Sequence, residues 1–263
     1  MTQEKVFARV FRYDPATDSK PYYKTYELPW KPYLSVLEVL VTIYEAYEDI
    51  AFDYGCRAVW CGRCGMMVNG KPVLACMTPV KPGEITIEPL KGFPVIRDMI
   101  VDRSKVKRKL HSIMPHLLRQ QPMEEMPVVS MEAYEKMCGL YRCTECLLCY
   151  TVCPVLKDNM NLTKFAGPAA LLRIGMRFYD PRDEGDRVAQ AVTEGLEHCT
   201  MCGLCHKVCY LGMESAKDLP NIQGPAGLYY IDHLAVLGDL RKAAEQRGLL
   251  PEKSKETADN TNR

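Results

Sequence analysis

The first hundred residues combine strand-like and helix-like patterns. Runs rich in β-branched and aromatic residues, bounded by proline, glycine and aspartate, are typical of short strands. They predict strands at Lys5–Tyr13, Tyr22–Leu28, Met66–Val68, Val73–Ala75 and Ile85–Glu88. Ser35 and Glu38 have the spacing of a helix capping box, and apolar residues recur at helical intervals from Leu37 to Tyr44. The pattern therefore predicts a small α+β domain, a sheet capped by one helix.

The second half of the chain is patterned as helices and contains an internal repeat. Residues 143–153 read CTECLLCYTVC, and residues 199–209 read CTMCGLCHKVC. Each run is followed by a Gly-Pro-Ala triplet, at 167–169 and at 224–226. Proline suits the first turn of a helix, where its missing N–H is harmless. We therefore expect a duplicated loop–helix unit, with helices at Leu171–Phe178 and Leu228–Leu240.

A change of character between Arg103 and Pro127 marks a connection between domains. The run RSKVKRKLH is basic, and QQPMEEMP contains two prolines. The basic run is interpreted as a solvated helix face, with an anionic membrane or a partner as the alternative contact. The predicted domains are residues 1–103 and 104–251, and residues 252–263, which lack apolar periodicity, are predicted to be a disordered tail.

Composition and charge exclude several classes of protein. The chain has 263 residues, 47% of them hydrophobic, and its net charge of +1 argues against a nucleic-acid binder held by bulk electrostatics. Its most apolar helical stretch, Val39–Tyr44, lies between two glutamates and is far shorter than the roughly 20 residues that cross a bilayer. The N-terminus MTQEKVFARV lacks the pattern of a secretory signal.

Thirteen cysteines are the unusual feature of the composition. Without an export signal, we expect a reducing compartment, where disulfides are rare, and an odd number cannot pair completely. The cysteines fall into three groups, within residues 56–76, 138–153 and 199–209. Groups at such spacings predict metal sites.

The two later groups have the ligand spacing of two-cluster bacterial ferredoxins. Both runs are C-x2-C-x2-C-x3-C, in which three cysteines hold one cubane and the fourth reaches the other. This predicts one cubane on Cys143, Cys146, Cys149 and Cys209, and another on Cys153, Cys199, Cys202 and Cys205. Structural zinc is the alternative, but it usually takes two separated C-x2-C pairs. Pro154 follows the fourth cysteine of the first run as the pattern expects, whereas Tyr210 replaces that proline in the second.

The first group has the spacing of plant-type [2Fe–2S] ferredoxins. Its members are Cys56, Cys61, Cys64 and Cys76, in the order C-x4-C-x2-C-x11-C. Glycines at 55, 62 and 65 are expected to let the backbone wrap closely around the cluster, with amide N–H groups aimed at sulfur. Zinc is again the alternative. Cys138 fits no set and is interpreted as a small buried side chain, and His198 and His206 are interpreted as loop residues near a cluster.

The chain contains no dinucleotide-binding G-x-G-x-x-G unit and no P-loop. It has no visible means of transforming an organic molecule, whereas iron–sulfur clusters transfer single electrons. The sequence therefore predicts a protein that connects a two-electron cofactor on one partner to an acceptor on another.

Three long stretches resemble the iron–sulfur subunit of succinate dehydrogenase and fumarate reductase. They are the cysteine loop CRAVWCGRCGMMVNGKPVLAC, the strand and linker IEPLKGFPVIRDMIVD, and the segment FAGPAALLRIGMRFYDPRD between the cysteine runs. The resemblance covers roughly residues 5–245. It implies an N-terminal β-grasp plant-type ferredoxin domain followed by an all-helical bacterial-ferredoxin-like domain.

The resemblance also implies partners. Succinate and fumarate would be interconverted at FAD on a flavoprotein subunit, and electrons would pass by the [2Fe–2S], the [4Fe–4S] and the third cluster to a quinone at an anchor subunit. The chain is then expected at the cytoplasmic side of the membrane, peripheral and held by its partners. The alternatives are a subunit of a related fumarate reductase not linked to quinone, a freely diffusing ferredoxin-like carrier, and a zinc-stapled adaptor.

Two departures from the family pattern concern the third cluster. Many members lack a cysteine at the position of Cys202 and hold a [3Fe–4S] cluster; with Cys202 present, a second [4Fe–4S] is predicted, and a [3Fe–4S] with Cys202 as a bystander is the alternative. Many members also place a tryptophan beside the quinone, where this chain has Lys157 and Asp158. Relatives with the extra cysteine often pair with a cysteine-rich subunit in place of a haem-bearing membrane anchor, which makes such a subunit a candidate partner.

Overall fold

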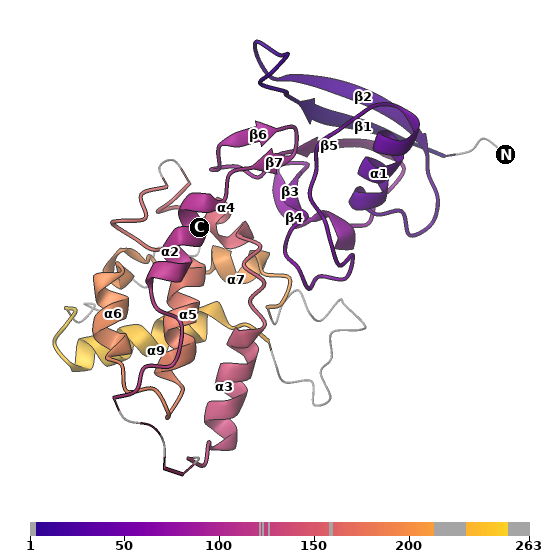
Figure 1. Ribbon diagram of the computed structural model, residues 1–263. Helices are drawn as coiled ribbons and strands as arrows, with labels where there is room; N and C mark the ends of the chain where they lie inside the picture. The colour runs from indigo at the N-terminus through magenta and orange to yellow at the C-terminus, as the bar shows by residue number, and fades with distance from the viewer. Residues whose placement is uncertain are drawn as a thin grey trace. The chain divides into compact units, whose positions relative to one another are not determined.

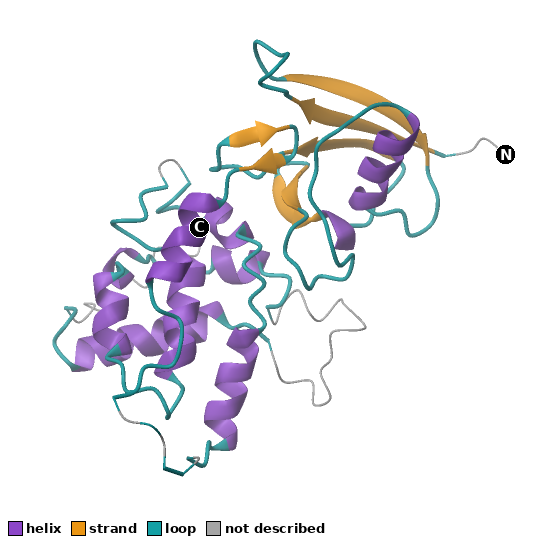
Figure 2. Ribbon diagram, viewed as in Figure 1, coloured by secondary structure: helices purple, strands orange, loops and turns teal. Residues whose placement is uncertain are grey.

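The computed structural model describes residues 4–120, 122, 124–125, 127–157, 160–212 and 230–251. The chain separates into two compact units. Unit one comprises Met1–Lys105 and Thr144–Val152, and unit two comprises Val106–Cys143 and Cys153–Arg263. The described strands lie in unit one, and unit two is built from helices (Figure 2). This arrangement confirms the predicted fold class.

Unit one is organised around a five-stranded mixed sheet of order β2-β1-β5-β3-β4 (Figure 1). The strands are β1 (Lys5–Arg12), β2 (Tyr22–Pro29), β3 (Gly65–Val68), β4 (Lys71–Leu74) and β5 (Gly83–Glu88). β1 pairs antiparallel with β2 and parallel with β5, and β3 pairs antiparallel with β4 and β5. All five predicted strands are present, with ends shifted by a few residues.

Helix α1 (Val36–Ala46) buries an apolar face within unit one. Ser35 Oγ accepts the Glu38 N–H at 3.2 Å, and Glu38 Oε2 accepts the Ser35 N–H at 2.8 Å, so the predicted capping box is confirmed. The buried residues of the helix form one apolar face: Val36, Leu37, Val39, Leu40 and Ile43. On β1 the alternate residues Val6, Ala8 and Val10 are also completely buried, as period-two patterning requires.

A buried ion pair anchors the segment that enters the first cysteine loop. The Arg12 Nε donates to Asp98 Oδ1 at 2.9 Å, and Asp98 also accepts the N–H groups of Tyr13 and Ala51. Asp98 lies between β6 (Val95–Arg97) and β7 (Ile100–Val101), a short hairpin. Residue 51 is thereby held five positions before the first cysteine of the loop.

Unit two consists of helices around α5 (Pro168–Phe178). α5 packs against α3 (Met131–Tyr141), α6 (Arg187–Thr193) and α9 (His233–Gln246). Unit two also contains α7 (Leu204–Val208), a 3₁₀ turn at Leu196–His198 and most of α2 (Ser104–Ser112), whereas α4 (Leu148–Val152) and the 3₁₀ turn at Ala75–Met77 belong to unit one. α5 is buried along nearly its whole length, and Pro168 occupies its first turn as predicted. The contact with α9 is close, because a Cβ on Gly175 would lie 2.3 Å from Val236 Cγ1.

The second predicted helix of the repeat begins later than expected. Tyr230–Asp232 are not helical: the Ile231 N–H donates to the Leu211 carbonyl at 2.8 Å, and the Asp232 side chain caps α9 at Ala235. The expectation of a helix from Leu228 is therefore wrong over these residues, because a backbone bridge and a new cap compete with the helix. Its first positions, the triplet at 224–226 and the tail 252–263 lie outside the described residues.

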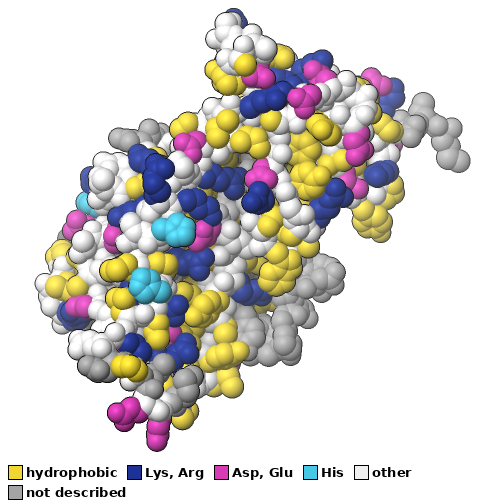
Figure 3. Space-filling view, in the orientation of Figure 1, with side chains coloured by type: hydrophobic (Ala, Val, Ile, Leu, Met, Phe, Trp, Pro, Cys, Tyr) yellow, Lys and Arg dark blue, Asp and Glu magenta, His cyan; other side chains and the backbone are white. Residues whose placement is uncertain are grey.

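Lys and Arg side chains are interspersed with Asp and Glu on the face drawn in Figure 3. Helix α2 carries the basic run, with Val106 and Leu110 buried and Lys105 and Arg108 exposed. Among the described residues, we find no helix that combines the length and the apolar character needed to cross a bilayer.

Candidate iron–sulfur sites

All thirteen cysteines lie within the described residues, and none forms a disulfide. Cys56, Cys61, Cys64 and Cys76 belong to unit one, and Cys153, Cys199, Cys202 and Cys205 belong to unit two. Of the set predicted for the second cluster, Cys146 and Cys149 belong to unit one, whereas Cys143 and Cys209 belong to unit two. Within the described ranges, no three His, Cys, Asp or Glu side chains form a site for a single metal ion.

The first cysteine loop surrounds its sulfur atoms with backbone amides. Cys56 Sγ accepts the N–H groups of Ala58, Trp60 and Cys61 at 3.4, 3.2 and 3.2 Å, and Cys61 Sγ accepts the Cys56 N–H at 3.4 Å. Such donors stabilise thiolate and the sulfur ligands of a cluster. The donor set therefore fits an iron–sulfur cluster, as the sequence predicted for amides aimed at sulfur.

Left-handed backbone conformations turn these amides inward. Arg57 and Val59 have φ of 56° and 68°, which is unusual for non-glycine residues and rare for a β-branched one. Alternating left-handed residues orient successive N–H groups toward one centre, where they form an anion-binding concavity. Neither residue type signals this conformation, so the sequence analysis missed it.

The two cysteine runs of the repeat share the same backbone pattern. Glu145 and Met201, which precede the second cysteine of each run, have φ of 52° and 58°. Leu147 and Gly203, which follow it, have φ of 67° and 76°. The repeat seen in sequence is thus a repeat of loop geometry, although only one of these four positions is a glycine.

Gly62 and Gly65 are required by the neighbouring loop in unit one. A Cβ on Gly62, whose φ is 64°, would lie 2.7 Å from the carbonyl oxygen of Thr144, and one on Gly65 would lie 3.3 Å from that of Cys146. A Cβ on Gly55 would be at 3.4 Å from Cys61 Sγ, an ordinary contact. That these glycines let the backbone wrap around the first cluster stays a prediction; in addition, Gly62 and Gly65 allow two cysteine loops to touch.

Hydrogen bonds shift the pKa values of three cysteines of the first set, Cys56, Cys64 and Cys76. Burial opposes ionisation of Cys56, but N–H donors from Ala58, Cys61 and Trp60 outweigh it and lower the Cys56 pKa. A hydrogen bond with the Cys64 thiol lowers the pKa of Cys76 to about 6, and the same pairing together with burial raises the pKa of Cys64.

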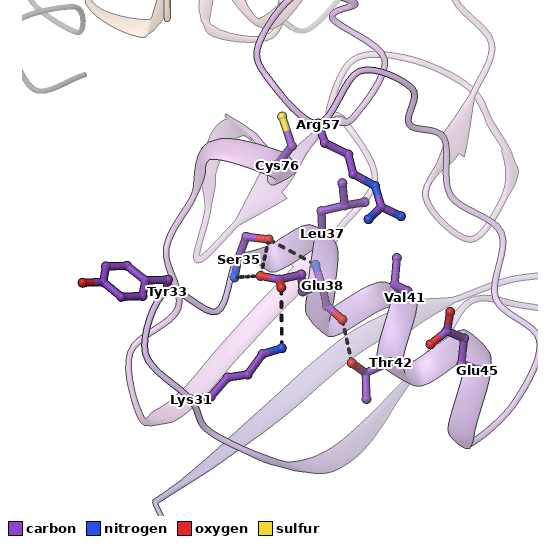
Figure 4. A pocket seen from close by; sticks show the side chains of 10 residues that line it. All are labelled: Lys31, Tyr33, Ser35, Leu37, Glu38, Val41, Thr42, Glu45, Arg57 and Cys76. Atoms are coloured by element: carbon purple, nitrogen blue, oxygen red, sulfur yellow. Dashed lines mark hydrogen bonds and ion pairs between the residues drawn. The ribbon is translucent and has the colours of Figure 1, made fainter. Parts of the chain in front are cut away.

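A pocket of about 520 Å³ lies beside Cys76 and Arg57, with Lys31, Glu38 and the α1 surface on its other walls (Figure 4).

The four cysteines predicted for the third cluster line one cavity in unit two. Its other walls are mainly apolar, from Pro154, Val155, Phe165, Pro168, Met201, Leu234 and Leu237. Burial, together with the charges of Cys199, Cys202 and Cys153, raises the pKa of Cys205 to about 12. Burial likewise raises the Cys153 pKa. Cys202, which is exposed, lines the cavity beside the other three, and four thiols around one mainly apolar space fit a cubane.

The remaining residues singled out in the sequence have ordinary surroundings. Cys138 is half-buried in α3, so the expectation of a small buried side chain is met only in part. His206 is buried beside Cys205 with its Nδ1 3.5 Å from Asp232 Oδ1, and His198 lies 3.3 Å from Glu197. Lys157 is exposed, and Asp158 lies outside the described residues.

Comparison with known protein families matches both halves of the chain. A family described as a 2Fe-2S iron-sulfur cluster binding domain matches residues 7–108, and one described as a 4Fe-4S dicluster domain matches residues 139–213. The structure resembles a chain of the Mycobacterium smegmatis Sdh1 complex in the apo form with a TM-score of 0.79 at 26% identity, covering 96% of this chain and all of the matched chain.

The chain is also similar to two curated relatives of different lengths. The fumarate reductase iron–sulfur subunit of Mycobacterium tuberculosis is 34% identical over 245 residues, which cover 88% of this chain and 96% of the relative. A subunit of the fumarate reductase (CoM/CoB) of Methanothermobacter marburgensis is 39% identical over 202 residues, which cover 76% of this chain. Those residues are only 40% of that relative, so this chain spans less than half its length.

Proposed function

Because this chain belongs to the family of iron–sulfur subunits of succinate dehydrogenase and fumarate reductase, we propose that it conducts electrons between FAD on a flavoprotein subunit and an acceptor on a further subunit. Chains of this family carry a [2Fe–2S], a [4Fe–4S] and a third cluster, which exchange single electrons. The observation that carries the proposal is the gathering of cysteines in separate loops of one short chain.

The ligand sets follow the spacing of the cysteines. We assign the [2Fe–2S] to Cys56, Cys61, Cys64 and Cys76, the [4Fe–4S] to Cys143, Cys146, Cys149 and Cys209, and the third cluster to Cys153, Cys199, Cys202 and Cys205. The amides around Cys56 and the shared, mainly apolar cavity beside Cys205 support the first and third sets. Succinate chemistry then takes place on the flavoprotein, and the complex is held at the cytoplasmic side of the membrane by its partners.

Iron content and activity test this function together. The purified holoprotein should contain about ten iron atoms, or about nine with a three-iron third cluster. The isolated chain should neither bind flavin nor oxidise succinate, whereas the complex purified with its partners should do both. Stoichiometric zinc, or succinate oxidation by the isolated chain, would refute the proposal.

The third cluster is proposed to be a second [4Fe–4S] with Cys202 as the fourth ligand. Cys202 lines the same cavity as the other three cysteines, and its charge acts on the Cys205 thiol. Freshly prepared anaerobic wild type should then lack the paramagnetic signal of an oxidised [3Fe–4S] cluster. Cys202→Ser should gain that signal, whereas Cys138→Ser, the matched control outside all three sets, should not. A strong three-iron signal in the wild type would restore the alternative assignment.

A second candidate function is a fumarate reductase that does not react with quinone. It is favoured by the 39% identity to a subunit named for CoM and CoB, and by Lys157 in the stretch where many family members place a tryptophan beside the quinone. The partner would then be a cysteine-rich subunit in place of a membrane anchor. Purification of the native complex from its membrane-free and membrane fractions, followed by assays with a quinol and with a thiol pair as electron donors for fumarate, distinguishes the two.

A further inference from the structure

Arg103 binds the first cysteine loop through its guanidinium group. Its Nη1 donates to the Gly62 carbonyl at 3.1 Å, and its Nη2 donates to the carbonyls of Arg63 and Gly65 at 2.9 and 3.3 Å. These carbonyls flank Cys64, so one planar side chain holds both sides of an assigned ligand. The forked guanidinium suits this task because its donors have fixed directions.

The second cysteine loop reaches the same point of unit one. A Cβ on Gly65 would lie 3.3 Å from the Cys146 carbonyl oxygen and 3.5 Å from Arg103 Nη2. A Cβ on Gly62 would meet Thr144 at 2.7 Å. The backbones of the two loops are therefore in contact, and Arg103 lies at their junction.

The charge of Arg103 faces sulfur without a carboxylate partner of its own. Burial lowers the pKa of Arg103, but a guanidinium remains protonated in proteins, and the charges of Cys146, Asp53 and Cys64 oppose the lowering. Asp53 is ion-paired with Arg63 at 3.2 Å. Throughout the described part of the chain, Arg103 lies in no ion pair. Its positive charge is thus directed to the cysteine loops.

We propose that Arg103 is a positioning residue that joins the first and second cluster loops and raises the reduction potentials of both clusters. The inference rests on the ligand sets assigned above. A cluster with its thiolates is an anion, and reduction adds one negative charge, so a nearby fixed cation stabilises the reduced form. Raising both potentials together keeps the two clusters matched for electron transfer between adjacent loops.

Redox titration of the full holoprotein, followed by electron paramagnetic resonance, tests the proposal. In Arg103→Met the reduction equilibrium constants of the first and second clusters should fall about tenfold, a shift of about 59 mV for one electron. The third cluster, whose assigned ligands lie in unit two, serves as the internal reference and should not shift. Arg103→Lys keeps the charge and should shift the first two clusters less than about threefold, while amide exchange at residues 62–65 becomes faster.

Arg63→Met is the matched control. It removes a charge of the same kind beside Cys64, but the Arg63 side chain is 61% exposed and already paired with Asp53, so the expected shift is below about threefold. If Arg103→Met shifts the potentials no more than Arg63→Met does, or if Arg103→Lys shifts them equally, the proposal is wrong. Arg103→Gln, which keeps an amide donor without the charge, replaces the methionine variant if that variant loses its clusters. A wild type without a [2Fe–2S] signal would instead refute the proposed function.

Discussion

The first and third cysteine sets are built on opposite physical principles. The first lies in a loop of unit one with Cys56 exposed, and backbone N–H groups surround its sulfur. The third lies in unit two, where apolar side chains of α5, α9 and the segment after Cys153 line one cavity with the four cysteines, of which Cys202 is exposed. Local hydrogen bonds shape the first site, and the packing of distant segments shapes the third.

The difference teaches how far each site depends on the rest of its unit. The first loop depends on its own amides and on contacts within unit one, among them those of Arg103 and Asp98. A cavity lined by Leu234 and Leu237, which follow Cys205 by about thirty residues, exists only while the helices stay packed. Perturbing the packing of unit two should therefore reach the third cluster and leave the first unchanged.

The largest effect is expected from Asp183→Asn in unit two. Asp183 accepts the Arg187 Nε and Nη2 at 2.8 Å and the N–H groups of Leu118 and Gly185, and its side chain is only 1% exposed. Loss of the carboxylate leaves Arg187 buried without its partner, and the free energy of unfolding should fall by about 3–5 kcal/mol. Urea unfolding of the apo chain measures it. Glu184→Gln, a neighbouring exposed carboxylate, should cost less than about 1 kcal/mol.

The Asp183–Arg187 ion pair also predicts how the stability of unit two changes in acid. Burial would raise the Asp183 pKa, but Arg187 and the N–H groups of Leu118 and Gly185 outweigh burial and hold the pKa below its ordinary value. The folded state therefore binds this proton less readily than the unfolded state, and the stabilisation is lost as pH falls below about 4. Stability measured between pH 6 and pH 3 should decline less in Asp183→Asn. Equal decline in both proteins would contradict this account.

The next largest effect is expected from Leu237→Ala, which opens the third cavity. Leu237 is 2% exposed, and truncation of a buried leucine lowers the free energy of unfolding by about 2–5 kcal/mol. Water should then reach the third cluster, whose loss to a chelator should be faster, while loss of the first cluster keeps its rate. Leu37→Ala, at a residue 3% exposed in α1, should cost similar stability without affecting the third cluster. If both variants accelerate loss of the third cluster equally, the comparison between the two units fails.

The smallest effects on stability are expected from two glycine substitutions, one in α5 and one in α9. Gly175→Ala places a methyl group against Val236 and should lower the free energy of unfolding by about 1 kcal/mol, as overpacking outweighs the gain in helix propensity. In Gly238→Ala the new methyl group meets only Met201 Cε, at 4.0 Å, and the free energy of unfolding should rise by up to about 1 kcal/mol. Thermal unfolding resolves the two signs. A stabilising Gly175→Ala would show that the helices are less closely packed.

The sequence by itself determined the elements and the chemistry. Runs rich in β-branched and aromatic residues predicted the strands of the sheet, Ser35 and Glu38 predicted the start of α1, and Pro168 predicted the start of α5, because each signal acts over a few residues. The spacing of the cysteines predicted iron–sulfur clusters for the same reason: ligands on one tight loop must follow fixed intervals, and the matches to cluster-binding families confirm that chemistry.

Only the tertiary structure decided what surrounds the cysteines. Several features have no signal in the local sequence. They are the left-handed conformations of Val59 and Leu147, the contact of Gly62 with Thr144, the apolar wall that Leu237 supplies, and the junction that Arg103 holds. Thr144–Val152 joins the sheet unit, although the residues on both sides of it belong to the helical one. These features depend on which segments, remote along the chain, come into contact, and the short-range patterns of a single sequence do not carry that information.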